Sequence, residues 1–189
     1  VHPNSILLEI EYDDMRKDAL EWLNEEIGIS SEELHETDAY FGPCSFINLI
    51  HQLQLEHTGA DISFAAPLSF DSVIPKGKIT VRDMFNLYRY ENYLYTLRLS
   101  GKEIKDILEL SYDRWTNTMQ SADDHIMKLS YVLNNGQRLG FENLAFNFIS
   151  AAGIRYEVDV TKPFGEKIRI LELNDGRIFD LDSLYAVAV

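Results

Sequence analysis

The sequence predicts an α+β fold in which mixed β-sheets are flanked by helices. Apolar residues at helical spacing dominate the first half of the chain, and strand-like runs with hairpin turns dominate the second half. The 189 residues are 46% apolar and 25% charged, which provides enough apolar material for a sizeable core. This uneven distribution favours an α+β sheet over the strict alternation of a doubly wound fold.

The elements of the first half follow from local patterns. Residues 1–12 form a strand-like run, and the apolar spacing that follows predicts a helix over 12–27. Residues 28–43 are expected to form a loop. A second helix is expected over 45–57, and the apolar stretch 60–66 is expected to be a buried strand.

Capping signals predict two more helices. Thr80 and Asp83 form a capping pair at the start of a short helix, and Ser100 and Glu103 form a capping box ahead of a longer amphipathic helix. Between these helices, side chains alternate between apolar and polar over 92–99, which is the period of a β-strand.

Turn signals organise the second half. Asn134-Asn135-Gly136 and Asn174-Asp175-Gly176 are predicted hairpin turns, because Asn-Gly and Asp-Gly accept positive φ easily. The stretches 146–160 and 167–189 are rich in strand formers, whereas the polar residues 116–130 remain ambiguous.

The formal net charge of −14 excludes several classes of partner. A chain with this much negative charge repels polyanions. We therefore expect neither a nucleic acid polymer nor an anionic membrane surface as a partner. A single bound nucleotide remains compatible with this charge, because one local site can oppose the net field. We expect no membrane span, since no apolar run approaches the ~18 residues that a spanning helix needs.

Catalytic signatures are scarce in this sequence. It contains no phosphate-binding glycine loop, no Gly-x-Ser-x-Gly motif and no zinc motif, so we expect no catalytic residue and no metal site in the chain. Asp123-Asp124-His125 is the only dense cluster of potential metal ligands, and a solvated loop explains it better. The aromatic run 88–95, by contrast, can stack on a flat heterocycle or pack on neighbouring strands.

A family resemblance favours the first interpretation of the aromatic run. Three ordered segments carry it, namely Thr58-Gly-Ala-Asp61, Ile74-Pro-Lys-Gly-Lys-Ile-Thr80 and Leu99-Ser-Gly-Lys-Glu103. Ser150-Ala-Ala-Gly-Ile-Arg-Tyr156 adds a fourth match. Together these segments resemble the C-terminal domain of 5′-nucleotidases and of the related 2′,3′-cyclic nucleotide 2′-phosphodiesterases over roughly residues 40–189.

The resemblance implies a layered α/β/β/α domain that binds the nucleoside part of a nucleotide. Catalysis would belong to a metallophosphatase domain, either fused upstream or present as a separate protein, and divalent metals would be expected there. This chain alone would then be inactive and would need no cofactor of its own. Family members are typically exported, which implies a periplasmic or cell-surface location and a role in nucleotide catabolism as part of a hydrolase.

The resemblance also implies a set of substrate-binding residues. Tyr90 takes the place of a base-stacking phenylalanine, and Asn92 keeps the place of a base-contacting asparagine. The family's glycine-rich Gly-Gly-Ile-Arg segment falls on Leu68–Asp71, where a carboxylate replaces the arginine and would repel phosphate. The predicted substrate-binding residues are Tyr90, Asn92, Glu91, Ser69, Phe70 and Asp71.

Two expectations about organisation complete the interpretation. Residues 1–40 are expected to be an N-terminal strand, helix and linker-like segment, and residues 41–189 a 5′-nucleotidase C-terminal-like domain truncated at its C-terminus. The loss of glycines and the Asp71 change leave one alternative open. The chain would then be a degenerate interaction module that keeps the fold without recognising nucleotides.

Overall fold

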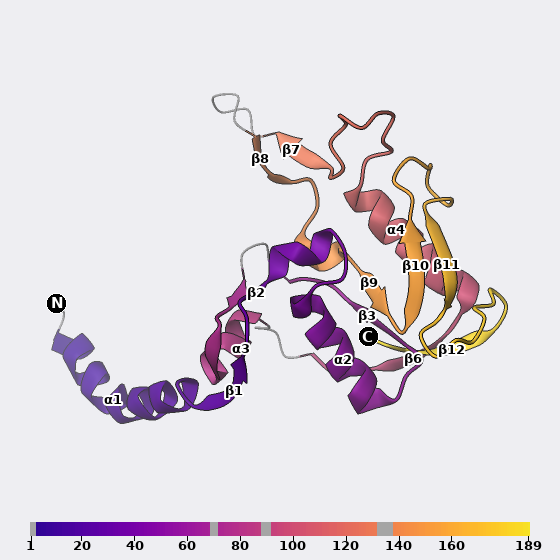
Figure 1. Cartoon of the computed structure of the whole chain (residues 1–189). Coiled ribbons are helices and arrows are strands. Elements are labelled where there is room, and N and C mark those ends of the chain that lie inside the picture. The colour runs from indigo at the N-terminus through magenta and orange to yellow at the C-terminus, as the bar shows by residue number, and fades with distance from the viewer. Residues whose placement is uncertain (1–2, 69–71, 88–91, 132–137) are drawn as a thin grey trace. The chain divides into compact units, whose positions relative to one another are not determined.

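The computed structural model describes residues 3–68, 72–87, 92–131 and 138–189 (Figure 1). These residues belong to two compact units, a smaller one with residues 1–35 and 72–91 and a larger one with residues 36–71 and 92–189. Among the described residues, no helix combines the length and hydropathy that a membrane crossing needs. The domain boundary expected between residues 40 and 41 stays a prediction.

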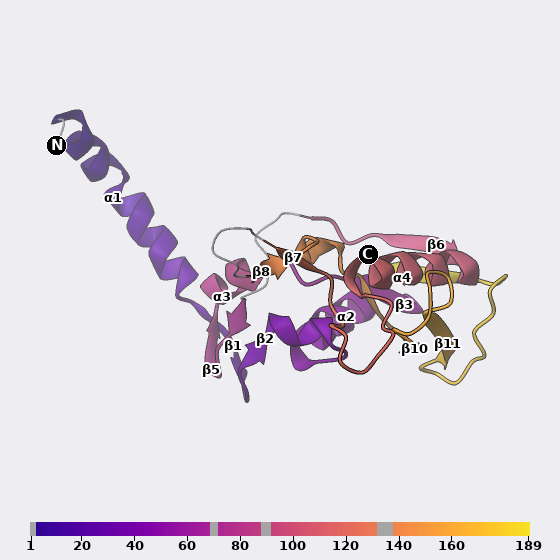
Figure 2. The same ribbon diagram turned by 90° about the horizontal axis from the view of Figure 1, so that it is seen from above.

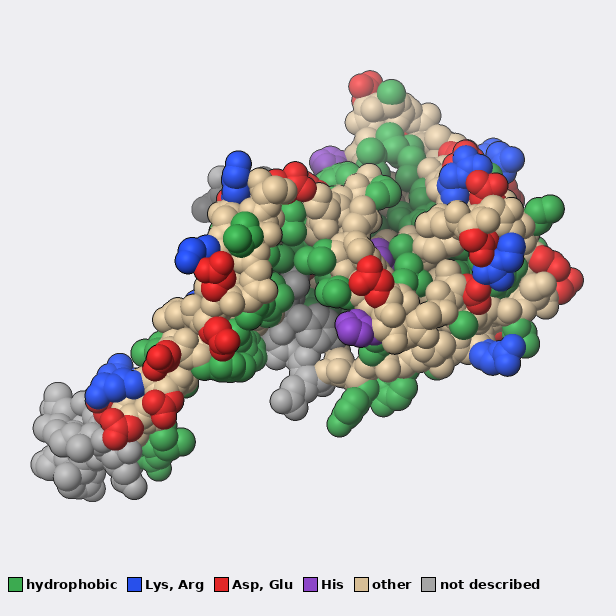
Figure 3. Space-filling view, turned by 60° about the horizontal axis from the view of Figure 1, so that its bottom comes forward, with side chains coloured by type: hydrophobic (Ala, Val, Ile, Leu, Met, Phe, Trp, Pro, Cys, Tyr) green, Lys and Arg blue, Asp and Glu red, His purple; other side chains and the backbone are tan. Residues whose placement is uncertain are grey.

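The smaller unit is built from a long helix, a short helix and two antiparallel strand pairs. Its elements are α1 (Pro3–Leu23), β1 (Glu26–Ser30), β2 (Leu34–His35), β4 (Val73–Ile74), β5 (Gly77–Thr80) and α3 (Val81–Leu87). β1 pairs with β5, and β2 pairs with β4. Trp22 of α1 packs edge-on against Phe85 of α3, with ring centroids 5.7 Å apart. Figure 3 shows charged side chains of both signs beside apolar ones along α1.

The start of the chain differs from the expectation. The run 1–12 is predicted to be strand-like, but α1 begins at Pro3 and continues through it to Leu23. Proline is favoured in a first helical turn, because the N–H it lacks would have no partner there, and the leucines and glutamates that follow are good helix formers. The helix expected over 12–27 ends at Leu23, and β1 begins at Glu26. The loop expected over 28–43 was also wrong in part, since it contains the end of β1, β2 and the 3-10 helix η1 (Glu36–Tyr40).

The larger unit holds a four-stranded mixed sheet with the order β6-β12-β3-β9. Only β3 and β12 run parallel, and the other neighbours are antiparallel. The remaining strands form the pairs β10-β11 and β7-β8. Its elements are α2 (Ser45–Thr58), β3 (Ile62–Ala65), β6 (Thr96–Ser100), α4 (Gly101–Trp115), β7 (Leu129–Tyr131), β8 (Arg138–Phe141), η2 (Ala145–Asn147), β9 (Ser150–Ala152), β10 (Ile154–Val158), β11 (Ile168–Leu173) and β12 (Leu184–Ala188).

The sheet is buried on both faces at β3, which explains why residues 62–65 are all buried. Ile62 and Phe64 share one face and pack in a core with Ile104 and Leu108 of α4 and with the β10-β11 pair. The other two residues of β3 point the opposite way, because side chains alternate along a strand. Ala65 packs there against α2. Figure 2 shows α4, α2 and β3 together in the larger unit. The mixed α+β class predicted from the sequence is confirmed.

The local capping predictions are confirmed. Ser100 and Glu103 form a complete capping box at the start of α4, and both the N–H and the hydroxyl of Thr80 donate to Asp83 at 2.7 and 2.8 Å. The turn at residues 174–176 follows β11, with Gly176 at φ +86°. The turn predicted at residues 134–136 lies outside the described residues. The strand predicted over 92–99 begins only at Thr96.

Candidate functional site

Two predicted site segments are connected to the same edge of the four-stranded sheet. The chain leaves β3 toward residues 69–71, and it enters β6 after residues 90–92. Ala188 of β12 lies opposite Ser63 of β3 in a parallel pair and opposite Thr96 of β6 in an antiparallel pair. The chain therefore leaves β3 and enters β6 at the same edge of the sheet. Beyond the strands, Tyr95 and Val189 exchange two backbone hydrogen bonds of 2.9 Å each, which extends the pairing at this edge.

We call residues 66–68 and 92–95 the β3/β6 edge. Asn92 is the predicted site residue that the structure describes, and it is exposed at this edge, four residues before β6 begins. Its role in binding stays a prediction. The other predicted site residues lie outside the described residues: Ser69, Phe70, Asp71, Tyr90 and Glu91.

Two exposed aromatic rings stand next to Asn92. Tyr93 is 82% exposed and Tyr95 59% exposed, and their rings meet edge to face with centroids 6.3 Å apart. The aromatic run could also be explained by packing on neighbouring strands. That explanation does not account for rings that are this exposed. Flat aromatic faces of this kind stack on nucleobases with little sequence preference. The β3/β6 edge therefore carries groups that suit a flat heterocycle.

A buried carboxylate anchors the backbone that leads into residues 69–71. Glu36 of η1 is 1% exposed, and its Oε1 accepts a hydrogen bond from the backbone N–H of Leu68. Nearby, burial raises the pKa of Tyr40, and the charge of Glu36 adds to that increase. The role of Glu36 could not be predicted from the sequence, because a single glutamate in an expected loop carries no signal of burial.

The matched motifs at Asp61 and Gly153 prove to be neighbours with a structural role. Asp61 accepts hydrogen bonds from the guanidinium of Arg177 at 2.6 Å and from the backbone N–H of Ala186 at 3.0 Å. The Arg177 hydrogen bond is the main reason that the pKa of Asp61 lies below its usual range. Gly153 packs its Cα face against the carbonyl of Asp61. The two motifs thus join β12, β3 and the β9-β10 turn.

A second polar cluster lies on the α2 face of the sheet. The ring of His51 is buried between two serines, with Nδ1 2.9 Å from Ser63 Oγ and Nε2 3.1 Å from Ser150 Oγ. Each serine hydroxyl also donates to a second partner, Ser63 to Gln54 Oε1 and Ser150 to the carbonyl of Ala65 at 3.3 Å. Burial lowers the pKa of His51 from 6.5 to about 4. This imidazole is therefore neutral at physiological pH.

This shift makes the stability of the fold depend on pH. Because the folded-state pKa of His51 is below its ordinary value, the unfolded chain binds more protons between pH 6.5 and pH 4. The histidine contribution is present above pH 6.5 and falls by up to about 3 kcal/mol as the pH approaches 4. Urea unfolding of the wild type and of His51→Gln at several pH values tests this. The stability difference between the two proteins should move in favour of the variant as the pH falls, and a constant difference contradicts the assignment.

No metal centre is present among the residues that the structure describes, where no group of three or more His, Cys, Asp or Glu side chains is arranged to hold an ion. Asp124 of the acidic cluster near His125 instead accepts hydrogen bonds from the backbone N–H groups of Gln120 and Ser121, at 2.6 and 2.9 Å. That cluster is a turn held by its own hydrogen bonds.

Comparison with solved structures defines the class of domain. The chain is similar to a putative 5′-nucleotidase from Staphylococcus aureus, with a TM-score of 0.72 and 23% sequence identity. The match covers 94% of this chain and 33% of that one. A 5′-nucleotidase precursor from Thermus thermophilus matches 92% of this chain and 31% of its own, with a TM-score of 0.63 and 21% identity. At this level of identity the likeness concerns the fold, which is that of a domain within nucleotidase-type proteins.

The family follows from the sequence itself. Residues 26–189 match the model of the family described as "5′-nucleotidase, C-terminal domain". The chain belongs to this family, as its ordered motifs indicate.

Curated relatives share the family at moderate identity. The trifunctional nucleotide phosphoesterase protein YfkN of Bacillus subtilis is 32% identical over 110 residues, which are 57% of this chain and 7% of that protein. A 2′,3′-cyclic-nucleotide 2′-phosphodiesterase/3′-nucleotidase of Salmonella typhimurium is 35% identical over 134 residues, which are 65% of this chain and 19% of that protein. The chain thus spans less than a fifth of the length of these relatives.

Proposed function

We propose that this chain is the nucleoside- or nucleotide-binding domain of a 5′-nucleotidase-like phosphoesterase. It positions the substrate for a metallophosphatase domain that lies outside the 189 residues, fused upstream or as a separate chain. The family assignment and the names of the relatives support this proposal. The whole protein would then be a hydrolase of nucleotide catabolism.

One observation carries the proposal beyond the family assignment. The β3/β6 edge gathers the ends of both predicted site segments and presents Asn92 beside two exposed tyrosine rings. A stacking surface and an amide that can pair with a base edge are the two elements that nucleobase recognition needs. Glu36 fixes the backbone at the start of the other segment through Leu68.

Each candidate residue has a defined part in the proposed complex. Tyr90 stacks on the base, and the Asn92 amide forms hydrogen bonds with the base edge. The segments around them complete the site. Because the carboxylate of Asp71 disfavours a nearby phosphate, the phosphate points away from this domain and toward the catalytic one. The proposed substrate-binding residues are Tyr90, Asn92, Glu91, Ser69, Phe70 and Asp71.

The contribution of such a domain to catalysis is positioning. By holding the base, it orients the phosphate ester for metal-assisted hydrolysis on the partner domain. The divalent metals belong to that partner domain and not to this chain. The residues of this chain bind and orient, and they make no contact with the reacting phosphorus.

The proposal is tested by calorimetric titration of adenosine, guanosine, uridine and their 5′-monophosphates into the protein. We expect a nucleoside to bind as tightly as its monophosphate. Tyr90→Ala and Asn92→Ala should each weaken binding by about tenfold or more, since one base-aromatic stack contributes roughly 1–3 kcal/mol. Tyr12→Ala, which truncates an exposed tyrosine of α1, is the matched control and should leave affinity unchanged.

Two results would count against the proposal. Unchanged nucleoside affinity in folded Tyr90→Ala and Asn92→Ala variants would rule out these residues as the site. Absence of any binding heat, together with a flat thermal-shift assay, would instead favour an interaction module that keeps the fold and has lost nucleotide recognition. The acidic Asp71 in the phosphate-facing segment is the observation behind that alternative.

We also propose a periplasmic or cell-surface location. The structurally similar Thermus thermophilus protein is a 5′-nucleotidase precursor, and a precursor is a protein that is processed after synthesis. Detection of the native protein in a periplasmic or surface fraction supports this location, and its recovery with cytoplasmic markers overturns it.

A further inference from the structure

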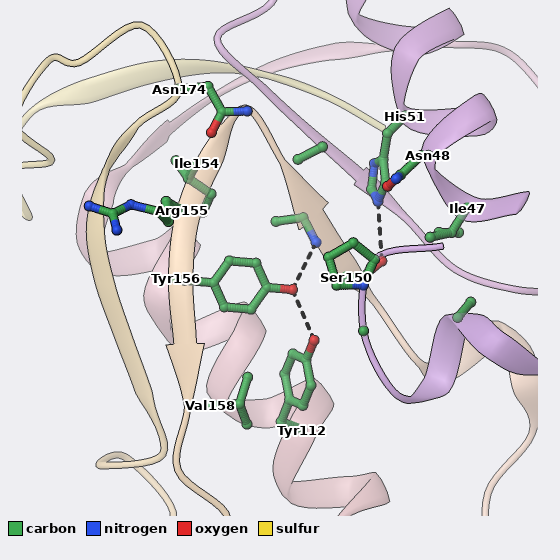
Figure 4. A pocket seen from close by; sticks show the side chains of 15 residues that line it. Ile47, Asn48, His51, Tyr112, Ser150, Ile154, Arg155, Tyr156, Val158 and Asn174 are labelled. Carbon is green, nitrogen blue, oxygen red and sulfur yellow. Dashed lines mark hydrogen bonds between the residues drawn. The ribbon is translucent and has the colours of Figure 1, made fainter. Parts of the chain in front are cut away.

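A cavity of about 410 Å³ lies in the larger unit, and Asn92, the described member of the predicted substrate-binding set, is not among its lining residues. Residues from α2, α4, β9 and β10 line it, so its walls belong to regular secondary structure and not to loops alone. Figure 4 shows Tyr112 and Tyr156 meeting within it, with His51 and Ser150 on the opposite wall. Ile47, Ile154 and Val158 supply apolar surface. The volume suits a molecule the size of a small aromatic ring compound or larger.

The two tyrosine hydroxyls leave one hydrogen atom without an acceptor. The oxygens are 2.9 Å apart, and Tyr156 Oη also accepts from the backbone N–H of Ala151 at 3.4 Å. Two hydroxyls carry two hydrogens, and their mutual hydrogen bond uses one of them whichever oxygen donates. Within the described residues no other acceptor is bonded to the pair. One phenolic hydrogen is therefore available to an occupant of the cavity.

Both hydroxyls keep their protons at physiological pH. Burial raises the pKa of Tyr112, and burial also raises the pKa of Tyr156. The pair consequently acts as a hydrogen-bond donor and never as an anion under these conditions. A neutral acceptor, such as a carbonyl oxygen, is the natural partner of that donor.

The remaining polar groups of the cavity bring no net charge. His51 is neutral, because burial lowers its pKa to about 4. The guanidinium of Arg155 forms an ion pair with Glu172 at 2.9 Å and points away from Tyr156 in Figure 4. A charged occupant would lose its hydration without gaining a counter-ion, which is unfavourable.

Two side-chain amides stand at the rim. Asn48 of α2 and Asn174 after β11 are both exposed, and neither side chain has a hydrogen-bond partner within the residues that the structure describes. Each amide offers donors and an acceptor together. Such groups complement an occupant that itself carries an amide or a similar neutral group.

We propose that this cavity is a binding site for a small, uncharged, planar molecule with a carbonyl acceptor, such as an aromatic amide. The carbonyl accepts the free phenolic hydrogen of the Tyr112–Tyr156 pair, and the ring packs between the apolar walls. The site shares no lining residue with the β3/β6 edge, so it is a second site and does not depend on nucleotide recognition there.

The test compares three molecules of the same shape and different charge. Benzamide, benzoate and benzamidinium are titrated into the ¹⁵N-labelled protein, and backbone amide shifts are followed by NMR. Benzamide should shift the signals of Ala151 and Ala152, with a Kd in the millimolar range that about nine non-hydrogen atoms allow. The two ions should bind at least about tenfold more weakly because of their desolvation.

Variants of the tyrosine pair identify the donor. Tyr112→Phe and Tyr156→Phe each leave one hydroxyl with a free hydrogen, so each single variant should keep measurable benzamide binding. The double variant Y112F/Y156F has no such hydrogen and should lose about tenfold or more in affinity. It is expected to fold, because both partners of the hydrogen bond are replaced together by groups of the same shape. Tyr12→Phe, at an exposed tyrosine of α1 that belongs to neither site, is the matched control.

Several outcomes overturn the proposal. If the backbone amide signals of Ala151 and Ala152 do not shift at benzamide concentrations well above the millimolar range, the cavity does not bind this molecule. Equal affinity for the three molecules would remove the argument from charge. Unchanged binding in the folded double variant, or a loss of binding in Tyr12→Phe, would move the site away from the tyrosine pair.

Discussion

Glu109→Ala is expected to lower the free energy of unfolding by about 3–5 kcal/mol, the range seen when one partner of a buried charged network is removed. The side chain of Glu109 is buried on α4. Its carboxylate accepts backbone N–H groups of Gly165, Lys167 and Ile168, at 2.9, 3.2 and 2.8 Å, and the ammonium of Lys105 at 3.0 Å. Truncation would leave these donors without an acceptor in a buried position.

The charge state of Glu109 gives this prediction a pH signature. Burial by itself would raise the pKa of Glu109, but the hydrogen bonds from Ile168, Lys105 and Gly165 together hold it below its usual 4.5. A carboxyl whose folded-state pKa is lowered stabilises the fold above its unfolded pKa and loses that contribution as the pH falls. The deficit of the variant should therefore be largest near neutral pH and smaller in acid.

Urea unfolding followed by circular dichroism measures the effect. Asp106→Ala, also on α4, is the matched control, because Asp106 pairs with Lys102 on the exposed side of the helix. Exposed pairs of this kind contribute about 0.2–1 kcal/mol, so the control should stay close to the wild type. A Glu109→Ala variant as stable as Asp106→Ala would show that the carboxylate does not hold residues 165–168 in place.

Gly153→Ala is expected to be destabilising by about 2–5 kcal/mol, from two causes that add. Gly153 has a φ of +88°, a left-handed conformation that costs an alanine roughly 1–2 kcal/mol. An added Cβ would also lie 2.2 Å from the carbonyl oxygen of Asp61, so the backbones of β3 and the β9-β10 turn would have to separate. Overpacking of this kind typically costs about 1–3 kcal/mol.

Gly176→Ala separates these two causes. Gly176 has nearly the same φ, +86°, but a Cβ built there meets no described atom within 4 Å. The control should therefore show only the conformational part, about 1–2 kcal/mol. Thermal or urea unfolding of both variants measures the difference. If the two substitutions prove equally destabilising, close packing against Asp61 is not the reason for glycine at position 153.

Much of the fold could be predicted where local chemistry decides it. The capping box at Ser100, the capping pair at Thr80 and the turn at residues 174–176 depend on side chains a few residues apart, and the structure confirms all three. The helical start of the chain was missed, because a dense apolar run fits a strand and a helix equally well when no partner is known. Only the propensities of individual residues favoured the helix.

The candidate site could be predicted only in part. The sequence order of the motifs indicated which segments belong to it, but the common edge depends on β12 lying between β3 and β6, a pairing that no local pattern encodes. Glu36 and the cavity at Tyr112 and Tyr156 could not be predicted at all, since burial of single polar groups is set by distant segments. His51 carried a weak signal, as a titratable residue within an otherwise apolar helix face.

The position of β12 between β3 and β6 also affects how the protein is made. Ser63 of β3 pairs with Ala188 of β12, two residues that are 125 positions apart in the sequence. At a synthesis rate of about 5–20 residues per second, β3 waits for its parallel partner for about 6–25 s after it is made. Until then the apolar strand has an open side, and pairings between such distant segments form slowly. Translation of this domain thus leaves an interval in which chaperones compete with aggregation for an unfinished sheet.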